Sequence, residues 1–174
     1  WHDLSRTAGL SGLYLKAARK RRISGDPLPS GGLHCAIAVD TARLQAYRKL
    51  CHFADDSHLP ATFPHVMAFA LQLQLLTADD FPFPLLGLVH LNNRIRVVRP
   101  LGGIGTLRFS VFVDNLQPHA KGATFDLMTE AEDSLGLLWH ERSRMLCRGV
   151  KLEGEPPAVD TPEPLPLGEL TRWY

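Results

Sequence analysis

The sequence predicts an α+β domain in which a long antiparallel sheet wraps around one buried helix. Residues 65–77 are apolar on nearly every side, which is typical of a helix enclosed by protein. Four later runs are rich in β-forming residues, and each is longer than the usual strand of about five or six residues. Within one of these runs, Leu107, Phe109, Val111 and Val113 alternate with more polar positions, so one face of the sheet is expected to lie against the helix.

The elements before the buried helix follow from caps and turn residues. Residues 34–39 read as a short strand, and Asp40 or Thr41 caps a helix that extends to about Phe53. The segments 27–32 and 55–60 are loops by composition. The four long runs are 86–98, 106–116, 123–131 and 135–148, and turn sequences containing Gly, Pro or Asp-Ser separate them.

Three segments divide the chain. We expect a lead-in at residues 1–33, the sheet-and-helix domain at 34–152, and a linker or tail rich in Pro and acidic residues at 153–174. The lead-in carries a basic run that could bind the phosphates of coenzyme A. The preferred interpretation is a solvated helix end, where cations complement the helix dipole. The run consists of Lys16, Arg19, Lys20, Arg21 and Arg22.

Composition narrows the class of protein. The 174 residues carry a formal net charge of +1, so nothing global indicates nucleic acid or an anionic membrane as a partner. The longest apolar stretch is interrupted by Gln72 and Gln74, and it is too short for a membrane span. The three cysteines lack the spacing of a zinc site or a disulfide framework, which predicts reduced thiols and a cytoplasmic location. No metal-ligand spacing, phosphate-binding glycine loop or serine-hydrolase elbow is present.

Several stretches of the sequence, among them Phe63-Pro-His65 and Gly87-Leu-Val-His90, resemble the MaoC-like acyl dehydratases, which have the hot-dog fold. The resemblance covers roughly residues 35–150 and is most distinctive at 63–65 and 87–90. It is closest to the amino-terminal half of members with two hot-dog units in one chain. It implies a unit of an (R)-specific enoyl hydratase or 3-hydroxyacyl dehydratase that binds an acyl-CoA or acyl-carrier-protein thioester, requires no cofactor, and pairs with a second hot-dog unit. That unit is either a carboxy-terminal half or the other subunit of a homodimer.

The family's catalytic motif, D-x-N-P-[LIV]-H, is absent from this chain. In members with two units the active half is the second, and residues 170–174 look like the lead-in to such a half. The chain also begins at Trp1 without a methionine, so we expect that an earlier segment has been removed or left out. Whether this chain is an enzyme by itself is therefore open, and the resemblance implies a non-catalytic half that shapes the acyl pocket.

The weak catalytic candidates are Asp55, Asp56 and His65. A histidine at a helix start could act in proton transfer, but a helix cap or a packed core histidine is the preferred interpretation. His90, Asn92, Arg94 and Arg96 are expected to share one face of a strand, either as a ligand-facing polar row or, preferably, as a solvated sheet face.

Aromatic residues near the helix could line an acyl-chain tunnel or could simply fill the core. With the resemblance in view, the candidate substrate-binding residues are Phe63, Pro64, His65, Phe69, Phe83 and His90. Two other functions remain open. A thioesterase would need a carboxylate on or beside the central helix, and residues 65–77 contain none. A non-enzymatic module for acyl or lipid binding, or for assembly, would retain an acyl ligand without turning it over.

Overall fold

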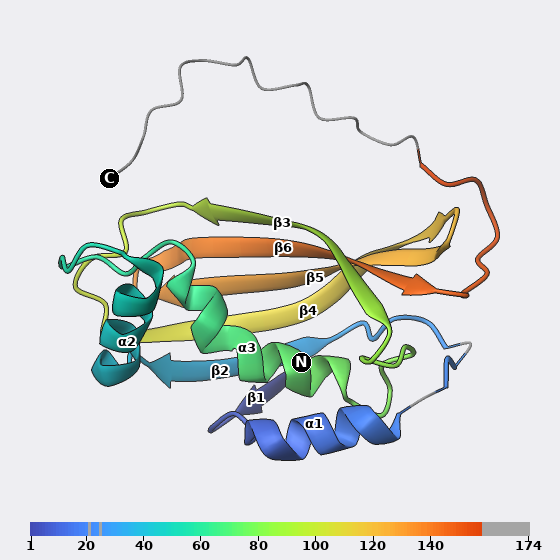
Figure 1. Ribbon diagram of the computed structural model, residues 1–174, viewed down its shortest axis with the longest axis horizontal. Helices are drawn as coiled ribbons and strands as arrows, with labels where there is room; N and C mark the ends of the chain where they lie inside the picture. Colours follow the sequence, from blue (N-terminus) through green and yellow to red (C-terminus); the bar gives the residue numbers. More distant parts are fainter. Residues whose placement is uncertain (21, 25, 158–174) are drawn as a thin grey trace.

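One six-stranded sheet and three helices build the chain in the computed structural model, which describes residues 1–20, 22–24 and 26–157. The strand order is β1-β2-β4-β5-β6-β3, and all neighbours are antiparallel except β1 and β2 (Figure 1). The elements are β1 (His2–Leu4), α1 (Leu10–Arg19), β2 (Gly32–Ala38), α2 (Thr41–Cys51), α3 (Phe63–Leu76), β3 (Leu88–Val97), β4 (Thr106–His119), β5 (Gly122–Asp133) and β6 (Gly136–Arg148).

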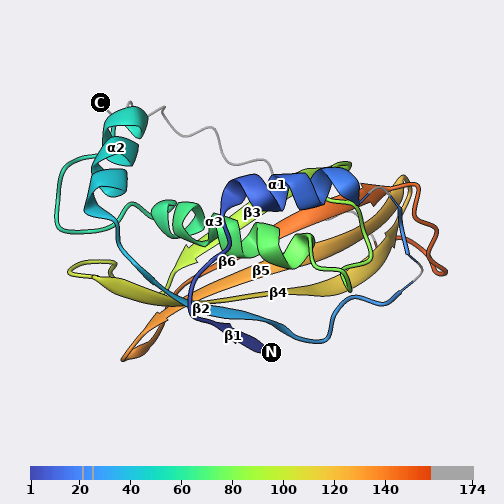
Figure 2. The ribbon, with the colours of Figure 1, turned by 90° about the horizontal axis from the view of Figure 1, so that it is seen from below.

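Helix α3 is the centre of the fold and confirms the predicted buried helix. It lies against one face of the curved sheet, called the helix side below, and the opposite face is called the outer face (Figure 2). Pro64 stands in its first turn, where the missing N–H costs no hydrogen bond. Nine of its residues are buried, and they point in several directions rather than along one stripe. The inward side chains of β4, among them Leu107, Phe109 and Val111, are fully buried in the same core.

Helix α1 packs beside α3 through the buried residues Leu13 and Ala17. Lys16 and Arg19 stand in the last turn of α1, as the helix-end interpretation predicts, and two lysines of the run also contact the segment after α3. Lys20 donates to the carbonyl oxygens of Ala78, at 2.7 Å, and Phe81. Lys16 forms an ion pair with Asp79. These two lysines therefore hold the segment after α3 in place.

The lead-in contributes more to the fold than the sequence predicts. Strand β1 adds to the sheet edge by pairing in parallel with β2, from His2 opposite Leu33 to Leu4 opposite Cys35. A three-residue strand carries too few residues for a periodic signal, and its pairing depends on a strand about thirty residues away. The tail predicted for 153–174 lies largely outside the described residues.

The long strands occur where they are predicted, but their order differs from a simple meander. β3 does not pair with β4, the next strand in sequence; it lies at the far edge beside β6. β4 continues past Leu116 to His119 because a register shift between Asp114 and Gln117 absorbs the turn-like residues. Asn115, at this irregularity, has a left-handed φ of 58°.

A bulge in β3 corrects the predicted polar row. His90 is opposite Met145, but Asn92 is opposite Arg144, so Leu91 is an extra residue on β3. Because paired residues share a face, His90 lies on the helix side, as do Asn93 and Ile95 after the bulge. Asn92, Arg94 and Arg96 lie on the outer face. His90 therefore does not share a face with these three, because a single inserted residue reverses the alternation.

Among the helices that the structure describes, none is both long enough and apolar enough to cross a bilayer.

A glycine at the start of β5 tests the strand packing. A Cβ at Gly122, whose φ is +155°, would stand 2.0 Å from the carbonyl oxygen of Cys147. We expect Gly122→Ala to lower the free energy of unfolding by about 3 kcal/mol, because backbone must move to admit the methyl group. Urea unfolding measures this change.

Gly136→Ala is the matched control. Gly136 also has a positive φ, of +99°, but a Cβ there meets nothing within 4 Å. Its cost is expected to be about 1 kcal/mol, from backbone strain alone. Equal costs for the two variants would show that the close approach to Cys147 is unimportant.

Candidate functional site

His65 and Glu141 form the core of a polar cluster inside the otherwise apolar domain. His65 lies in the first turn of α3, and Glu141 lies on the helix side of β6. The Nδ1 atom of His65 is 2.9 Å from the Glu141 carboxylate. Because an ionised carboxylate only accepts hydrogen bonds, Nδ1 must be the donor, and Nε2 is the nitrogen left to face a ligand or solvent. The His65 side chain is 34% exposed, whereas that of Glu141 is 0% exposed.

The buried carboxylate of Glu141 is fully surrounded by donors. Gln72 on α3 donates to it at 3.2 Å and also donates to Thr129 on β5 at 2.9 Å. Asn93 on β3 and the Ser143 hydroxyl on β6 donate to the other carboxylate oxygen. A buried charge is tolerated only when it is paired and hydrogen-bonded in this way. The cluster thus joins α3 to three strands of the sheet.

Both partners of the pair are shifted toward their charged forms. The hydrogen bond to Glu141 raises the pKa of His65, although burial opposes this shift. Burial alone would raise the pKa of Glu141, but hydrogen bonds from His65, Asn93 and Gln72, together with the charge of His65, bring it below its ordinary value. The imidazolium–carboxylate pair is therefore favoured over the neutral pair.

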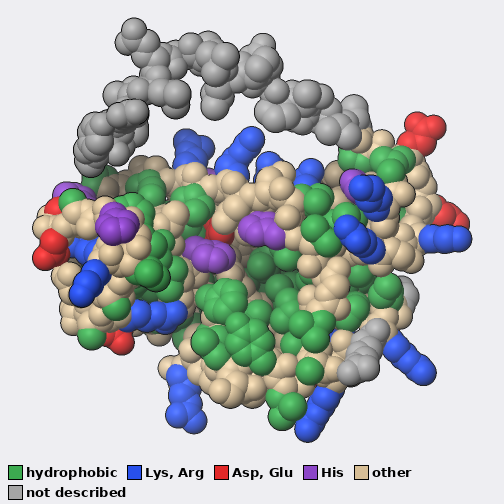
Figure 3. Space-filling view, viewed as in Figure 1, with side chains coloured by type: hydrophobic (Ala, Val, Ile, Leu, Met, Phe, Trp, Pro, Cys, Tyr) green, Lys and Arg blue, Asp and Glu red, His purple; other side chains and the backbone are tan. Residues whose placement is uncertain are grey.

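The exposed part of the cluster lies among apolar side chains near the β3 edge of the sheet. The ring of Phe69 on α3 is half-buried, with its centroid 6.3 Å from that of His65. On β3, Ile95 and the exposed His90 lie on the same helix side. Figure 3 shows histidine side chains near the middle of this face, with hydrophobic side chains beside them. Such a surface suits a ligand with an apolar body and few polar atoms.

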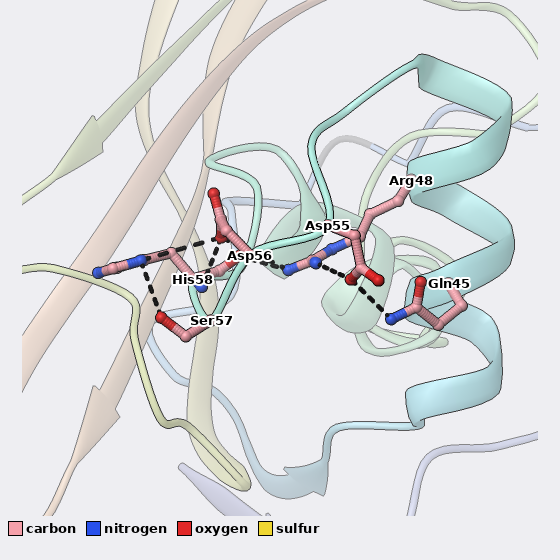
Figure 4. Close-up of polar contacts among 6 residues, drawn as sticks. All are labelled: Gln45, Arg48, Asp55, Asp56, Ser57 and His58. Atoms are coloured by element: carbon pink, nitrogen blue, oxygen red, sulfur yellow. Dashed lines mark hydrogen bonds and ion pairs between the residues drawn. The ribbon is translucent and has the colours of Figure 1, made fainter.

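The two aspartates predicted as weak catalytic candidates are used elsewhere. Asp55 accepts hydrogen bonds from Gln45 at 3.0 Å and Arg48 at 2.7 Å (Figure 4). Asp56 accepts from the backbone N–H of His58 and lies 3.8 Å from the guanidinium of Arg48. Hydrogen bonds from Gln45 and Arg48 lower the pKa of Asp55. These contacts organise the loop after α2 and leave His65 paired with Glu141 instead.

Arg48, on α2, is the residue that holds that loop. Its side chain is only 4% exposed, and it donates to the carbonyl oxygen of His58 at 2.6 Å as well as to Asp55. The same loop ends with Leu59 hydrogen-bonded to Leu101, which ties it to the segment between β3 and β4. Arg48 therefore has a structural role, because the groups that its guanidinium contacts belong to the loop that follows α2.

The aromatic candidates separate into two groups. Phe63, Pro64 and Phe83 are buried in the hydrophobic core, and Phe83 packs against Phe125 with ring centroids 5.6 Å apart. Phe69, with His65 and His90, is the part of the predicted binding set that reaches the surface. No group of three or more potential metal ligands occurs within residues 1–20, 22–24 and 26–157.

The sequence analysis missed Glu141, although a signal for it exists. On β6 the helix-side positions are Trp139, Glu141, Ser143, Met145 and Cys147, so Glu141 is an acidic residue within a largely inward row. Gln72 is likewise a polar interruption of an apolar helix. The two signals are 69 residues apart in sequence, and only the fold brings the side chains together.

The pair makes stability depend on pH in a defined direction. His65, whose pKa is raised above 6.5, stabilises the fold fully below about pH 6.5 and loses this contribution as pH rises through its folded value. Glu141, whose pKa is lowered below 4.5, stabilises above about pH 4.5 and loses this contribution as pH falls through its folded value. The free energy of unfolding lost in Glu141→Gln should therefore be largest between these limits, at about 2 kcal/mol.

Urea unfolding of both proteins across this pH range measures the difference. His140→Gln is the control, because His140 neighbours Glu141 on β6 but lies on the outer face. The control should show no such maximum. A Glu141→Gln profile parallel to that of the wild type would refute the ion pair.

No protein-family profile matches the chain. Over 121 residues the chain is 29% identical to the 3-hydroxyacyl-thioester dehydratase X of Mycobacterium tuberculosis, and the match covers 69% of this chain and 43% of that protein. The crystal structure of HtdX from Mycobacterium tuberculosis is similar with a TM-score of 0.60 and 27% identity, covering 65% of this chain and 48% of that one.

A MaoC-like dehydratase from Phytophthora capsici has the same fold, with a TM-score of 0.58 and 19% identity over 78% of this chain and 52% of that one. The chain thus spans about half the length of these relatives. The chain has the hot-dog fold and is homologous to a 3-hydroxyacyl-thioester dehydratase, which confirms the predicted resemblance to the MaoC-like acyl dehydratases.

Proposed function

We propose that this chain is the non-catalytic hot-dog unit of an (R)-specific enoyl-thioester hydratase or 3-hydroxyacyl-thioester dehydratase, and that it shapes the acyl pocket. The observation that carries the proposal is the homology to a 3-hydroxyacyl-thioester dehydratase of which the chain matches less than half. The absence of the D-x-N-P-[LIV]-H motif supports the non-catalytic role.

The contacts of the candidate acids and bases support the same role. Hydration of an enoyl thioester needs one group to activate water and one to protonate the α-carbon. Asp55 and Asp56 are held by Arg48 and by their own loop, so neither is paired with His65. Glu141 is fully buried, and its carboxylate accepts hydrogen bonds from four donors. His65 alone provides one proton-transfer group where the reaction needs two.

The helix side near β3 is the surface that this unit would offer to an acyl chain. Phe69 and Ile95 provide apolar contact, and His65 and His90 provide the few polar atoms. A second hot-dog unit paired along β3 would cover this surface and satisfy the backbone groups of the edge. The ligand would then be an acyl-CoA or acyl-carrier-protein thioester held between the two units.

Thioester hydrolysis is a second candidate function, because Glu141 places a carboxylate beside the central helix. When His65 is in its neutral form, above its raised pKa, its Nε2 atom could accept a proton from water that attacks the thioester carbonyl. This function would require the dyad to act without further groups of this chain, since Asp55 and Asp56 are engaged elsewhere.

Enzyme assays of the purified chain separate these functions. We expect no hydration of crotonyl-CoA at an enzymatic rate, because loss of a positioned acid or base typically costs a factor of about 10² to 10⁴. The absorbance of the enoyl thioester reports hydration, and released thiol reports hydrolysis. His65→Ala should reduce stability or the binding of a saturated acyl-CoA more than it changes either rate.

Asp55→Asn and Asp56→Asn serve as controls, because they alter the loop of Arg48 and not the cluster of His65. Hydration that is rapid in the wild type and abolished by any of the three substitutions would place the catalytic site in this chain. Rapid hydrolysis that depends on both His65 and Glu141 would favour the thioesterase.

A further inference from the structure

The Nε2 atom of His65 is a polar atom that the protein holds in place but does not use. Nδ1 of the same ring lies 2.9 Å from the carboxylate of Glu141. Among the hydrogen bonds and ion pairs of residues 1–20, 22–24 and 26–157, none involves Nε2. In the same part of the chain, buried side-chain atoms without a partner occur in Arg48 and Arg142 and not in His65, so solvent reaches Nε2.

The position and protonation of the ring make Nε2 a fixed donor. The carboxylate that orients the ring is itself held by Gln72 on α3, Asn93 on β3 and Ser143 on β6. The hydrogen bond to Glu141 raises the pKa of His65, which favours the form with a proton on both ring nitrogens. A donor that is fixed before binding loses little conformational freedom when a ligand arrives.

The surface around this donor provides no acceptor for it. The ring of Phe69 is 6.3 Å from that of His65, and Ile95 lies on the same helix side of the sheet. Neither α3 nor β3 contains an aspartate or glutamate. Water therefore satisfies Nε2 while the surface is open. A hydrocarbon chain laid over His65 would remove that water and leave a charged donor unpaired, which is unfavourable.

An oxygen atom on the chain would remove this penalty, and the chemistry of the pair indicates its kind. The imidazolium and the Glu141 carboxylate are neutral as a pair. A ligand carboxylate at Nε2 would add a second negative charge across the ring from Glu141, whereas a hydroxyl or carbonyl oxygen accepts the hydrogen bond without it. A neutral oxygen acceptor therefore suits the site better than an anion.

The position of that oxygen follows from the division of labour in the proposed function. If another unit performs the chemistry, that unit contacts the thioester carbonyl and the two carbons that gain or lose water. The unit described by this chain then contacts the acyl group further along. The oxygen that meets His65 is thus remote from the thioester and is not one of the reacting groups.

We propose that His65 makes this unit selective for acyl thioesters that carry a hydroxyl or carbonyl oxygen beyond the third carbon, by donating a hydrogen bond to that oxygen from Nε2. The inference rests on the proposed function, in which an acyl chain lies on the helix side, and it adds the class of acyl group. Gln72, Asn93 and Ser143 act as positioning residues, because they reach His65 only through Glu141.

Binding of paired ligands to the full chain tests this selectivity. The probes are decanoyl-CoA and the hydroxydecanoyl-CoAs with the hydroxyl at each carbon from the fourth to the tenth, and calorimetry measures each Kd. The wild type should bind at least one hydroxylated isomer at least about tenfold more tightly than decanoyl-CoA, because a site that donates to an oxygen rejects the analogue lacking it. His65→Phe keeps an aromatic ring but no donor, and it should abolish this preference.

Two further variants separate the lost hydrogen bond from damage to the fold. His65→Phe/Glu141→Gln removes the buried charge together with its partner, and it should also show no preference. His140→Phe, on the outer face, should keep the wild-type preference. Because the preference is a ratio of two Kd values on one protein, a loss of stability that weakens both ligands equally leaves it unchanged.

The outcomes distinguish the inference from the function on which it rests. Equal binding of decanoyl-CoA and every hydroxylated isomer by the wild type would overturn the inference and leave the acyl pocket intact. A preference that persists in both His65→Phe proteins would also overturn it, because the donor would then be another group. No binding of any of these acyl-CoAs would remove the acyl pocket of the proposed function and the inference with it.

Discussion

The enclosure of α3 by the sheet is the constraint on which the rest of the structure depends. A helix that is apolar on several sides needs a protein surface on each of them, and a curved sheet provides most of that surface. Both ends of α3 are tied down by polar contacts. Trp139 on β6 donates to the Ala61 carbonyl just before the helix at 2.7 Å, and Lys20 caps carbonyls just after it. The side chains that the helix carries are thereby placed at defined points on the sheet.

This enclosure explains why the polar residues of the core form one cluster. Water cannot reach Gln72 on α3, so its amide must find partners on the strands that cover it. Thr129 and Glu141 supply them. His65, in the first turn of the same helix, adds a hydrogen bond to the carboxylate from the exposed side. The cluster is thus a product of burial, and the His65 side chain, 34% exposed, is accessible at its edge.

Much of the fold could be predicted from the sequence because it is encoded in local patterns. The all-round apolarity of 65–77 and the alternation from Leu107 to Val113 depend on residues that are close together in sequence. Topology could not be predicted in the same way. Whether β3 pairs with β4 or with β6 depends on which edge remains free after the other strands assemble, and no local pattern records it. The parallel pairing of β1 was missed for the same reason.

The candidate site was only half predicted, and the reason is again distance along the chain. His65 was recognisable by its place at a helix start, but its partner Glu141 lies 76 residues later. Asp55 and Asp56 are near His65 in sequence, but they contact Arg48. The carboxylate beside His65 is that of Glu141, which no nearby residue in the sequence indicates. The match to the two Mycobacterium tuberculosis relatives covers less than half of each, 43% of one and 48% of the other.

The extra residue at Leu91 divides β3 into two segments with opposite phase. Before it, odd positions such as Val89 face outward; after it, even positions such as Arg94 do so. An alignment that treats β3 as a uniform strand will therefore equate inward residues of one protein with outward residues of another that lacks the insertion. Selection can also act on the two segments separately, since a change of length on one side of Leu91 leaves the facing of the other side unchanged. The strand that borders the sheet thus consists of two segments, and the pairing register of each sets its own facing.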